Sequence, residues 1–183
     1  MKKYLIVIAL IVTNLYCYTQ EPMFQTYSAD LLIIATKEGK DFQWQNKDIA
    51  VTLNYKTGDF KAIIHNNDFV NKQSNIRANE DSISNNSEFM LIDIFPIDRI
   101  IDQKAINQDY DIELQLVNND ISLSEMLNFK MNVMRTNQNA GSYRVFTLTG
   151  TLYNDELNLP AFRGYDNEVE IRLMFNGFWS GHR

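Results

Sequence analysis

Apolar and polar residues alternate one by one along several segments, and this alternation restricts the possible fold more than any other feature of the chain. Ile112, Leu114 and Leu116 are separated by charged or amide residues, and 169–175 repeats the pattern. Successive side chains of a β-strand point to opposite faces, so such segments predict strands with one buried face. Further strands are predicted at 29–36, 42–44, 49–55, 60–64, 129–134 and 143–152.

Turn-forming residues separate these strands. The segment 56–59 contains Gly58, and together with the strands on either side it predicts a β-hairpin. Asn-rich turns are predicted at 118–120 and 137–141, because Asn and Asp tolerate left-handed backbone. The polar segment Asn66 to Glu88 predicts a long loop. The apolar stretch 89–97 predicts an edge or bulged strand, because Pro96 cannot donate to a sheet ladder.

Seven to nine short alternating strands predict an all-β fold with a short helix at most. A single antiparallel β-barrel of the lipocalin-like kind fits this pattern, and a β-sandwich is the alternative. Neither a repeat nor a shift in composition divides residues 20–183, so this range is expected to form one domain.

The first nineteen residues predict a secretory signal peptide. Lys2 and Lys3 precede an uncharged apolar run at 4–12, and Cys17 and Thr19 fit the positions before a cleavage site at Gln20. The run is too short for a permanent membrane anchor. A buried N-terminal strand or helix is the alternative. With a signal peptide, the protein is expected to be exported to the periplasm or the extracellular space.

Cys17 is the only cysteine and lies within the predicted signal. A lipidated cysteine normally follows a small residue, whereas Tyr16 is bulky; lipidation of Cys17 is thus the less favoured alternative. Cleavage before Gln20 leaves a chain without cysteine, which excludes disulfides, thiol catalysis and thiolate metal sites.

Charge argues against nucleic acid as a partner. The chain has 17 Lys and Arg against 23 Asp and Glu, a net charge of −6, and loss of Lys2 and Lys3 takes it to −8. An acidic chain repels phosphate backbones.

No catalytic or metal-binding motif is present. His65 and His182 are the only histidines, and their positions at a predicted strand end and beside the last residue argue against a metal site or a Ser-His-Asp triad. No glycine-rich phosphate loop occurs. Acids are plentiful but scattered, and the simplest interpretation is that they form solvated strand faces; the densest group is Asp93, Asp98, Asp102, Asp109, Asp111 and Glu113. We therefore expect no enzyme, no cofactor and no metal.

The inward faces of the predicted strands are where a ligand would bind. Counting every second residue along each strand assigns apolar and aromatic side chains to these faces, where they would line a ligand site. An ordinary packed core is the alternative interpretation of the same residues. The predicted ligand-lining residues are Trp44, Leu53, Tyr55, Phe60, Ile64, Leu114, Phe129, Met131, Leu173 and Phe175.

Four stretches resemble the YceI-like family of exported, lipocalin-like β-barrel proteins. The early strands of that family are similar to 42–44 and to the 49–64 hairpin with Gly58, Asp59 and Phe60 at its turn, and its Phe/Tyr-Pro segment is similar to 89–97. The strand and turn at 110–120 and the closing pattern at 146–148, 157–160 and 169–173 are also similar. An Asn-Asn-Asp turn replaces the usual glycine turn of the second half, and an Asn/Ser-rich segment stands in the middle.

The resemblance implies a hydrophobic lumen that binds an isoprenoid-like or other amphiphilic lipid without catalysis. The alternative is a structural or protein-interaction domain with a filled core. Its working surface would be an edge strand, the 66–88 loop or the aromatic pair at 178–179. An apolar small molecule or lipid is thus the expected partner, and nothing in the sequence predicts an oligomeric state.

Overall fold

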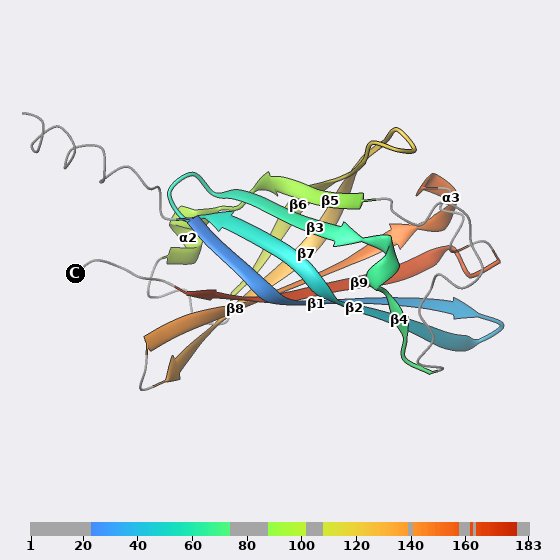
Figure 1. Ribbon diagram of the computed structural model, residues 1–183, viewed down its shortest axis with the longest axis horizontal. Coiled ribbons are helices and arrows are strands. Elements are labelled where there is room, and N and C mark those ends of the chain that lie inside the picture. The colour runs from blue at the N-terminus through green and yellow to red at the C-terminus, as the bar shows by residue number, and fades with distance from the viewer. Residues whose placement is uncertain are drawn as a thin grey trace, which may run out of the picture.

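Eight antiparallel strands close into a barrel in the computed structural model (Figure 1). The structure describes residues 23–73, 88–101, 108–138, 141–157, 162 and 164–178. The predicted signal peptide with Cys17 and the aromatic residue Trp179 lie outside these ranges. In chain order the elements are β1 Met23–Lys37, β2 Lys40–Asn54, β3 Asp59–His65, the 3-10 turn η1 Asn66–Asp68, β4 Val70–Asn71, β5 Glu88–Ile94, α2 Ile97–Ile101, β6 Gln108–Asn118, β7 Leu123–Gln138, β8 Gly141–Tyr153, α3 Asn154–Leu157 and β9 Glu168–Phe178.

Strand β1 closes the barrel because it pairs on both of its sides. Leu31 lies opposite Leu173 of β9, and Ile33 lies opposite both Ile171 of β9 and Trp44 of β2. The order of strands around the sheet is β1-β9-β8-β7-β6-β5-β3-β2, and β2 pairs back to β1. The short β4 adds to the edge of β2. The prediction of an all-β barrel is confirmed, and the sandwich alternative is wrong.

The alternation in the sequence matches the two faces of the barrel wall. In β6, Ile112, Leu114 and Leu116 are buried, whereas Asp111 and Glu113 between them are exposed. Strand β9 follows the same pattern from Val169 onward. The buried residues of all the main strands form one hydrophobic cluster, so the core lies inside the barrel.

Two buried asparagines shape the turns after β2 and β6 in the same way. The Oδ1 of Asn54 accepts hydrogen bonds from the backbone N–H groups of Lys56 and Thr57, at 2.9 and 3.3 Å. The Oδ1 of Asn118 accepts from the N–H groups two and three residues further on, at 2.9 and 3.3 Å. Gly58 completes the first turn with φ +84°, where a Cβ would overlap the carbonyl oxygen of Phe95. The predicted turns at 56–59 and 118–120 are confirmed, and the turn predicted at 137–141 includes residues outside the described ranges.

Three local predictions need correction. Residues 42–44 and 49–55 belong to one strand, β2, whose irregular register beside Asn46 interrupts the alternation. The stretch 89–97 is not an edge strand. Its strand, β5, ends at Ile94, before Pro96, and pairs with both β3 and β6. The segment 66–88 contains η1 and β4, and its residues 74–87 lie outside the described part.

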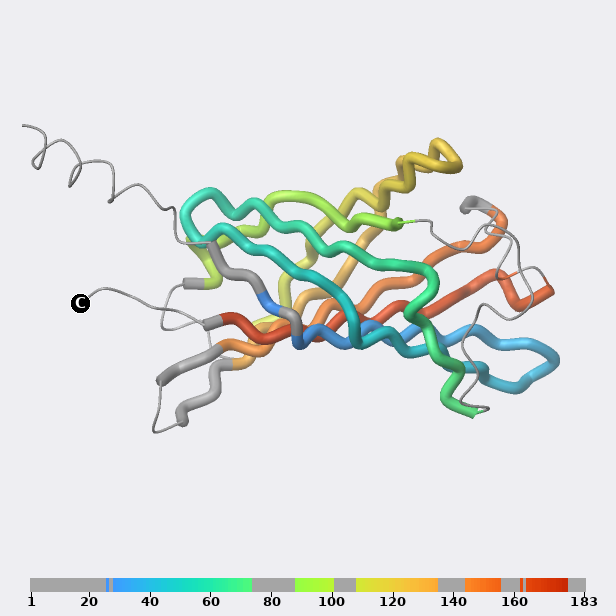
Figure 2. The backbone as a smooth tube through the Cα atoms, in the orientation of Figure 1, coloured from blue at the N-terminus to red at the C-terminus, as the bar shows by residue number. Residues whose placement is uncertain are grey.

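The two ends of the barrel are closed differently. Helix α2 lies at one end, and the β1–β2 hairpin, β4 and the connection from β8 to β9 lie at the other (Figures 1 and 2). Ile97 and Ile100 of α2 are 5% and 1% exposed, so the helix inserts apolar side chains into the core. Within the described residues, no helix is long and apolar enough to cross a membrane.

Candidate functional site

Nine of the ten residues predicted to line a ligand site are buried in the barrel interior, and the tenth, Trp44, lies at one mouth of the barrel. Trp44 is half-buried and packs against the core, and each of the other nine is at most 5% exposed. Strand parity therefore identified the inward face correctly. Whether these side chains bind a ligand stays a prediction, because burial of this kind is also what an ordinary core requires.

A stack of four phenylalanines, Phe60, Phe95, Phe146 and Phe175, fills the end of the interior next to α2. The ring centroids of Phe60 and Phe95 are 4.3 Å apart, and those of Phe146 and Phe175 are 4.8 Å apart with nearly parallel planes. Phe60 and Phe175 join the two pairs at 5.7 Å. This phenylalanine stack makes the α2 end a tightly packed part of the barrel.

Tyr55 places a polar group beside this stack. Its side chain is 5% exposed, and a Cβ added at Gly177 would overlap its hydroxyl oxygen. Burial raises the pKa of Tyr55 to about 12, and the nearby positive charge of Arg144 opposes this shift only in part. The phenol is therefore neutral at neutral pH, so it is not poised as a base or a nucleophile.

A second aromatic group, here called the aromatic end, closes the opposite mouth of the barrel. It consists of Phe42 and Trp44 of β2 with Phe162 and Tyr165 from the β8–β9 connection. The Tyr165 ring meets those of Phe42 and Trp44 edge to face at 5.6 and 5.5 Å, and Phe162 meets Trp44 at 5.9 Å. Phe42, Trp44 and Tyr165 are only half-buried, in contrast to the phenylalanine stack.

Within its described residues, the β8–β9 connection forms hydrogen bonds both to the barrel mouth and within itself. The N–H of Asp166 donates to the carbonyl oxygen of Thr36 at 2.7 Å, and the side-chain amide of Asn154 donates to the carbonyl oxygen of Phe162 at 2.7 Å. The ammonium of Lys37 lies 5.6 Å from the centre of the Tyr165 ring. The aromatic end thus combines two side chains of strand β2 with two of the β8–β9 connection, whereas the phenylalanine stack is contributed mainly by strands. The alternation used to find inward residues does not extend into the β8–β9 connection, so Phe162 and Tyr165 were missed.

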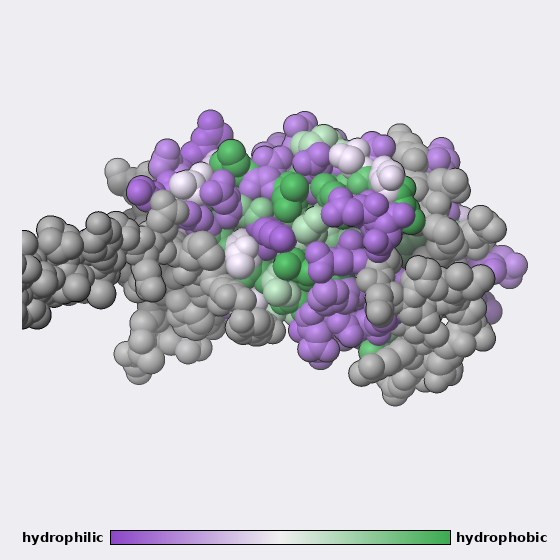
Figure 3. Space-filling model, turned by 45° about the horizontal axis from the view of Figure 1, so that its top comes forward, coloured by the Kyte–Doolittle hydropathy of each residue, from purple (hydrophilic) through white to green (hydrophobic). Residues whose placement is uncertain are grey.

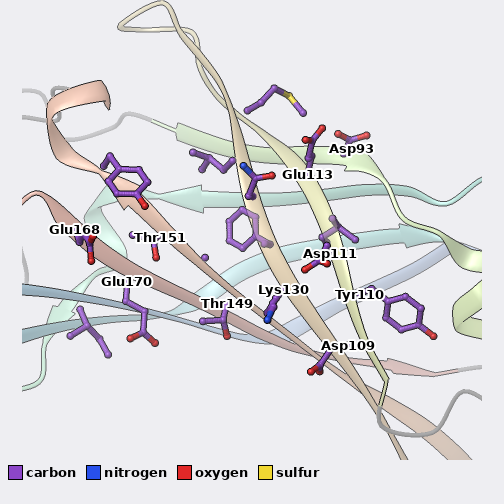
Figure 4. A pocket seen from close by; sticks show the side chains of 18 of the residues that line it. Asp93, Asp109, Tyr110, Asp111, Glu113, Lys130, Thr149, Thr151, Glu168 and Glu170 are labelled. Atoms are coloured by element: carbon purple, nitrogen blue, oxygen red, sulfur yellow. The ribbon is translucent and has the colours of Figure 1, made fainter.

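The acids that were scattered in the sequence come together outside the barrel. A broad groove of about 1,980 Å³ runs along the outer surface and is bordered by residues from β1, β2, β5, β6, β7, β8 and β9 (Figure 4). We call it the acidic groove, because eight of its lining residues are acids and only Arg99 and Lys130 are basic. The acids are Asp41, Asp93, Asp109, Asp111, Glu113, Asp166, Glu168 and Glu170.

The remaining predicted candidates lie elsewhere. Asp98 borders a separate, smaller hollow beside α2, and Asp102 is outside the described residues. His65 is exposed on β3, with its Nδ1 4.0 Å from a Glu88 carboxylate oxygen. Among the described residues, no three His, Cys, Asp or Glu side chains are grouped so that they could hold a metal ion.

Comparison with known proteins supports the fold. No protein-family model and no curated protein matches the sequence. A solved structure of a polyisoprenoid binding domain from Saccharophagus degradans, implicated in plant cell wall breakdown, superposes with a TM-score of 0.61. The two sequences are 9% identical, and the match covers 87% of this chain and 99% of that chain. The chain therefore has the barrel fold of that binding domain.

Proposed function

We propose that this protein is an exported, non-catalytic member of the YceI-like family that binds an apolar or amphiphilic lipid, such as an isoprenoid, inside its barrel. The observation that carries the proposal is the contrast between the two ends of a closed apolar barrel. The end next to α2 is packed by stacked rings, whereas at the other end three of the four rings, Phe42, Trp44 and Tyr165, are only half-buried. The polyisoprenoid-binding neighbour of the same fold supports this choice of ligand class.

The ligand would enter through the aromatic end. Displacing Phe162 and Tyr165 disturbs edge-to-face contacts and loop hydrogen bonds such as that from the N–H of Asp166, whereas opening the other end would break the core around α2. A chain of methylene or isoprene units would then replace the rings of Phe162 and Tyr165 as the packing partner of Trp44. Burial of apolar surface supplies the driving force, at roughly 25 cal/mol per Å².

A specific observation also favours the alternative of a filled core without a ligand. Nine of the ten predicted lining residues are at most 5% exposed, so lipid uptake requires the interior side chains to rearrange. The uptake experiment below separates the two functions, because a filled core takes up nothing.

Trp44 provides the test. Trp179 is the only other tryptophan, so the variant Trp179→Phe makes Trp44 the single reporter. Titration with a long-chain isoprenoid alcohol is expected to shift the Trp44 emission to shorter wavelength, and native mass spectrometry is expected to show one added ligand mass. The reciprocal variant Trp44→Phe controls for effects remote from the aromatic end. An unchanged emission together with an unchanged mass would refute lipid binding and favour the filled core.

A pair of tyrosine variants tests the route of entry. Tyr165→Ala removes a ring from the aromatic end and is expected to accelerate uptake. The matched control is Tyr153→Ala, which removes an outer-surface ring that is 42% exposed. Equal uptake rates in the two variants would contradict entry at this end. Export is tested separately, by the mass of the protein recovered outside the cytoplasm, which is expected to begin at Gln20.

A further inference from the structure

The acidic groove lies outside the barrel and has no role in the lipid site proposed above. Of the ten predicted lumen residues only Phe129 borders it. Exposed apolar side chains also line the groove, among them Ile94, which is 66% exposed, and Met126, which is 53% exposed. The groove therefore combines negative charge with apolar surface, which is a combination suited to an amphipathic cation. The space-filling view shows that hydrophobic residues also reach the outer surface among hydrophilic ones (Figure 3).

One wall of the groove is an edge of β6 that has no strand partner in the described part of the chain, here called the open edge. The pairing of β5 with β6 ends at Ile92 and Gln115, whereas β6 continues to pair with β7 as far as Gln108. On the side away from β7, residues 108–114 therefore have no strand partner within the described part of the chain. Along an antiparallel edge, alternate residues point their N–H and C=O groups outward, which makes such an edge a template for another strand.

The side chains of β6 define the sequence pattern that an added strand would need. Asp109, Asp111 and Glu113 are exposed and border the groove (Figure 4), whereas Tyr110 is half-buried and Ile112 is buried. Asp109 accepts a hydrogen bond from the Asn132 side chain at 2.7 Å. Among the described residues, neither Asp111 nor Glu113 forms a salt bridge or a side-chain hydrogen bond, although Lys130 of β7 lies opposite Asp111. Cross-strand pairs of opposite charge stabilise a sheet, so the added strand should have basic residues on its outward face.

Other occupants fit these observations less well. A metal ion needs converging ligands, and the described acids are not grouped in that way. A nucleic acid or an anionic membrane surface would be repelled by the carboxylates. A second copy of the same edge would place acids opposite acids, which destabilises a strand pair.

We propose that the acidic groove binds an extended basic polypeptide segment, which adds as a strand to the open edge of β6 between Gln108 and Leu114. Its backbone continues the β6 ladder, its alternate lysine or arginine side chains face Asp111 and Glu113, and its intervening apolar side chains lie toward the barrel wall. Recognition of this kind takes affinity from backbone hydrogen bonds and specificity from alternate side chains.

A fluorescent peptide of alternating lysine and valine is the probe, and anisotropy measures its binding. The double variant Asp111→Asn with Glu113→Gln is expected to weaken binding about threefold to tenfold, since exposed charge pairs contribute modestly. The matched control, Asp48→Asn with Asp120→Asn, changes the net charge equally at exposed acids outside the groove. A peptide of alternating glutamate and valine is expected not to bind. Equal loss in the two double variants, or no binding of the lysine peptide, would overturn the proposal.

Hydrogen exchange supplies the second measurement. Strand addition is expected to protect backbone amides within 108–114 when the lysine peptide is bound. Binding that leaves these amides unprotected would overturn strand addition. Isoprenoid uptake should be the same in both double variants, so the result for the groove is independent of the result for the lumen.

Discussion

The buried phenol of Tyr55 gives the barrel a dependence on alkaline pH that a single substitution should remove. In the unfolded chain the pKa of Tyr55 takes its ordinary value of 10.0, and in the folded barrel burial raises it to about 12. Below pH 10 the group is neutral in both states and contributes no pH dependence. Above pH 10 the unfolded state loses the proton first, so folding stability falls as the pH rises toward 12.

The magnitude follows from the two pKa values. A shift of one pKa unit corresponds to about 1.4 kcal/mol, so at about pH 11, midway between the two values, Tyr55 lowers the free energy of unfolding by about 1.4 kcal/mol. Denaturant titrations at about pH 8 and pH 11 measure this quantity. The Tyr55→Phe variant should lose about 1.4 kcal/mol less than the wild type between the two conditions.

The control is Tyr153→Phe, which removes the hydroxyl of a tyrosine that is 42% exposed. Its stability should fall with pH as that of the wild type does. The reasoning is refuted if wild type and Tyr55→Phe lose the same free energy, because the buried hydroxyl would then titrate no differently from one in the unfolded chain.

Three further substitutions test the packing of the barrel by denaturant unfolding. Phe146→Ala leaves a cavity in the fully buried phenylalanine stack and should lower the free energy of unfolding by about 3–5 kcal/mol. The control Met174→Ala, at an exposed side chain, should change it by less than about 0.5 kcal/mol. Similar values for the two variants would contradict tight packing of the stack. Gly150→Ala should cost about 1–3 kcal/mol, because its Cβ would lie 2.8 Å from a phenylalanine ring atom and 2.9 Å from a backbone oxygen; unchanged stability would show that the ring moves freely. Asn54→Ala should cost about 1–2 kcal/mol, because a buried side chain loses two hydrogen bonds to the turn, and exposed Asn119→Ala should cost much less.

The strands and turns could be predicted because their signals are local. In β6 each buried residue is two positions from the next, and in the turn after it Asn118 forms hydrogen bonds with residues two and three further on. The sequence therefore contains both the face and the end of the strand. The predicted inward residues follow from parity alone.

The parts that were missed depend on contacts between distant segments. The chain after Ile94 leaves the sheet and forms α2, which is stabilised by burial of Ile97 and Ile100. This helix of five residues is too short to show a helical periodicity in the sequence. The acidic groove brings together side chains from β1, β2 and β5 to β9, and the alternation within one strand does not predict the curvature of the sheet that brings them together. The aromatic end joins β2 to the β8–β9 connection for the same reason.

Closure of the barrel between β1 and β9 also determines when the protein can fold. Leu31 pairs with Leu173, so the last seam of the wall joins residues from nearly opposite ends of the chain. While the chain is being synthesised, β1 lacks its second neighbour until β9 has been made, and both remain open edges. Contacts so far apart in sequence form slowly, and open edges invite aggregation in the meantime. A truncation that removes β9 should therefore leave a chain that aggregates rather than a smaller barrel.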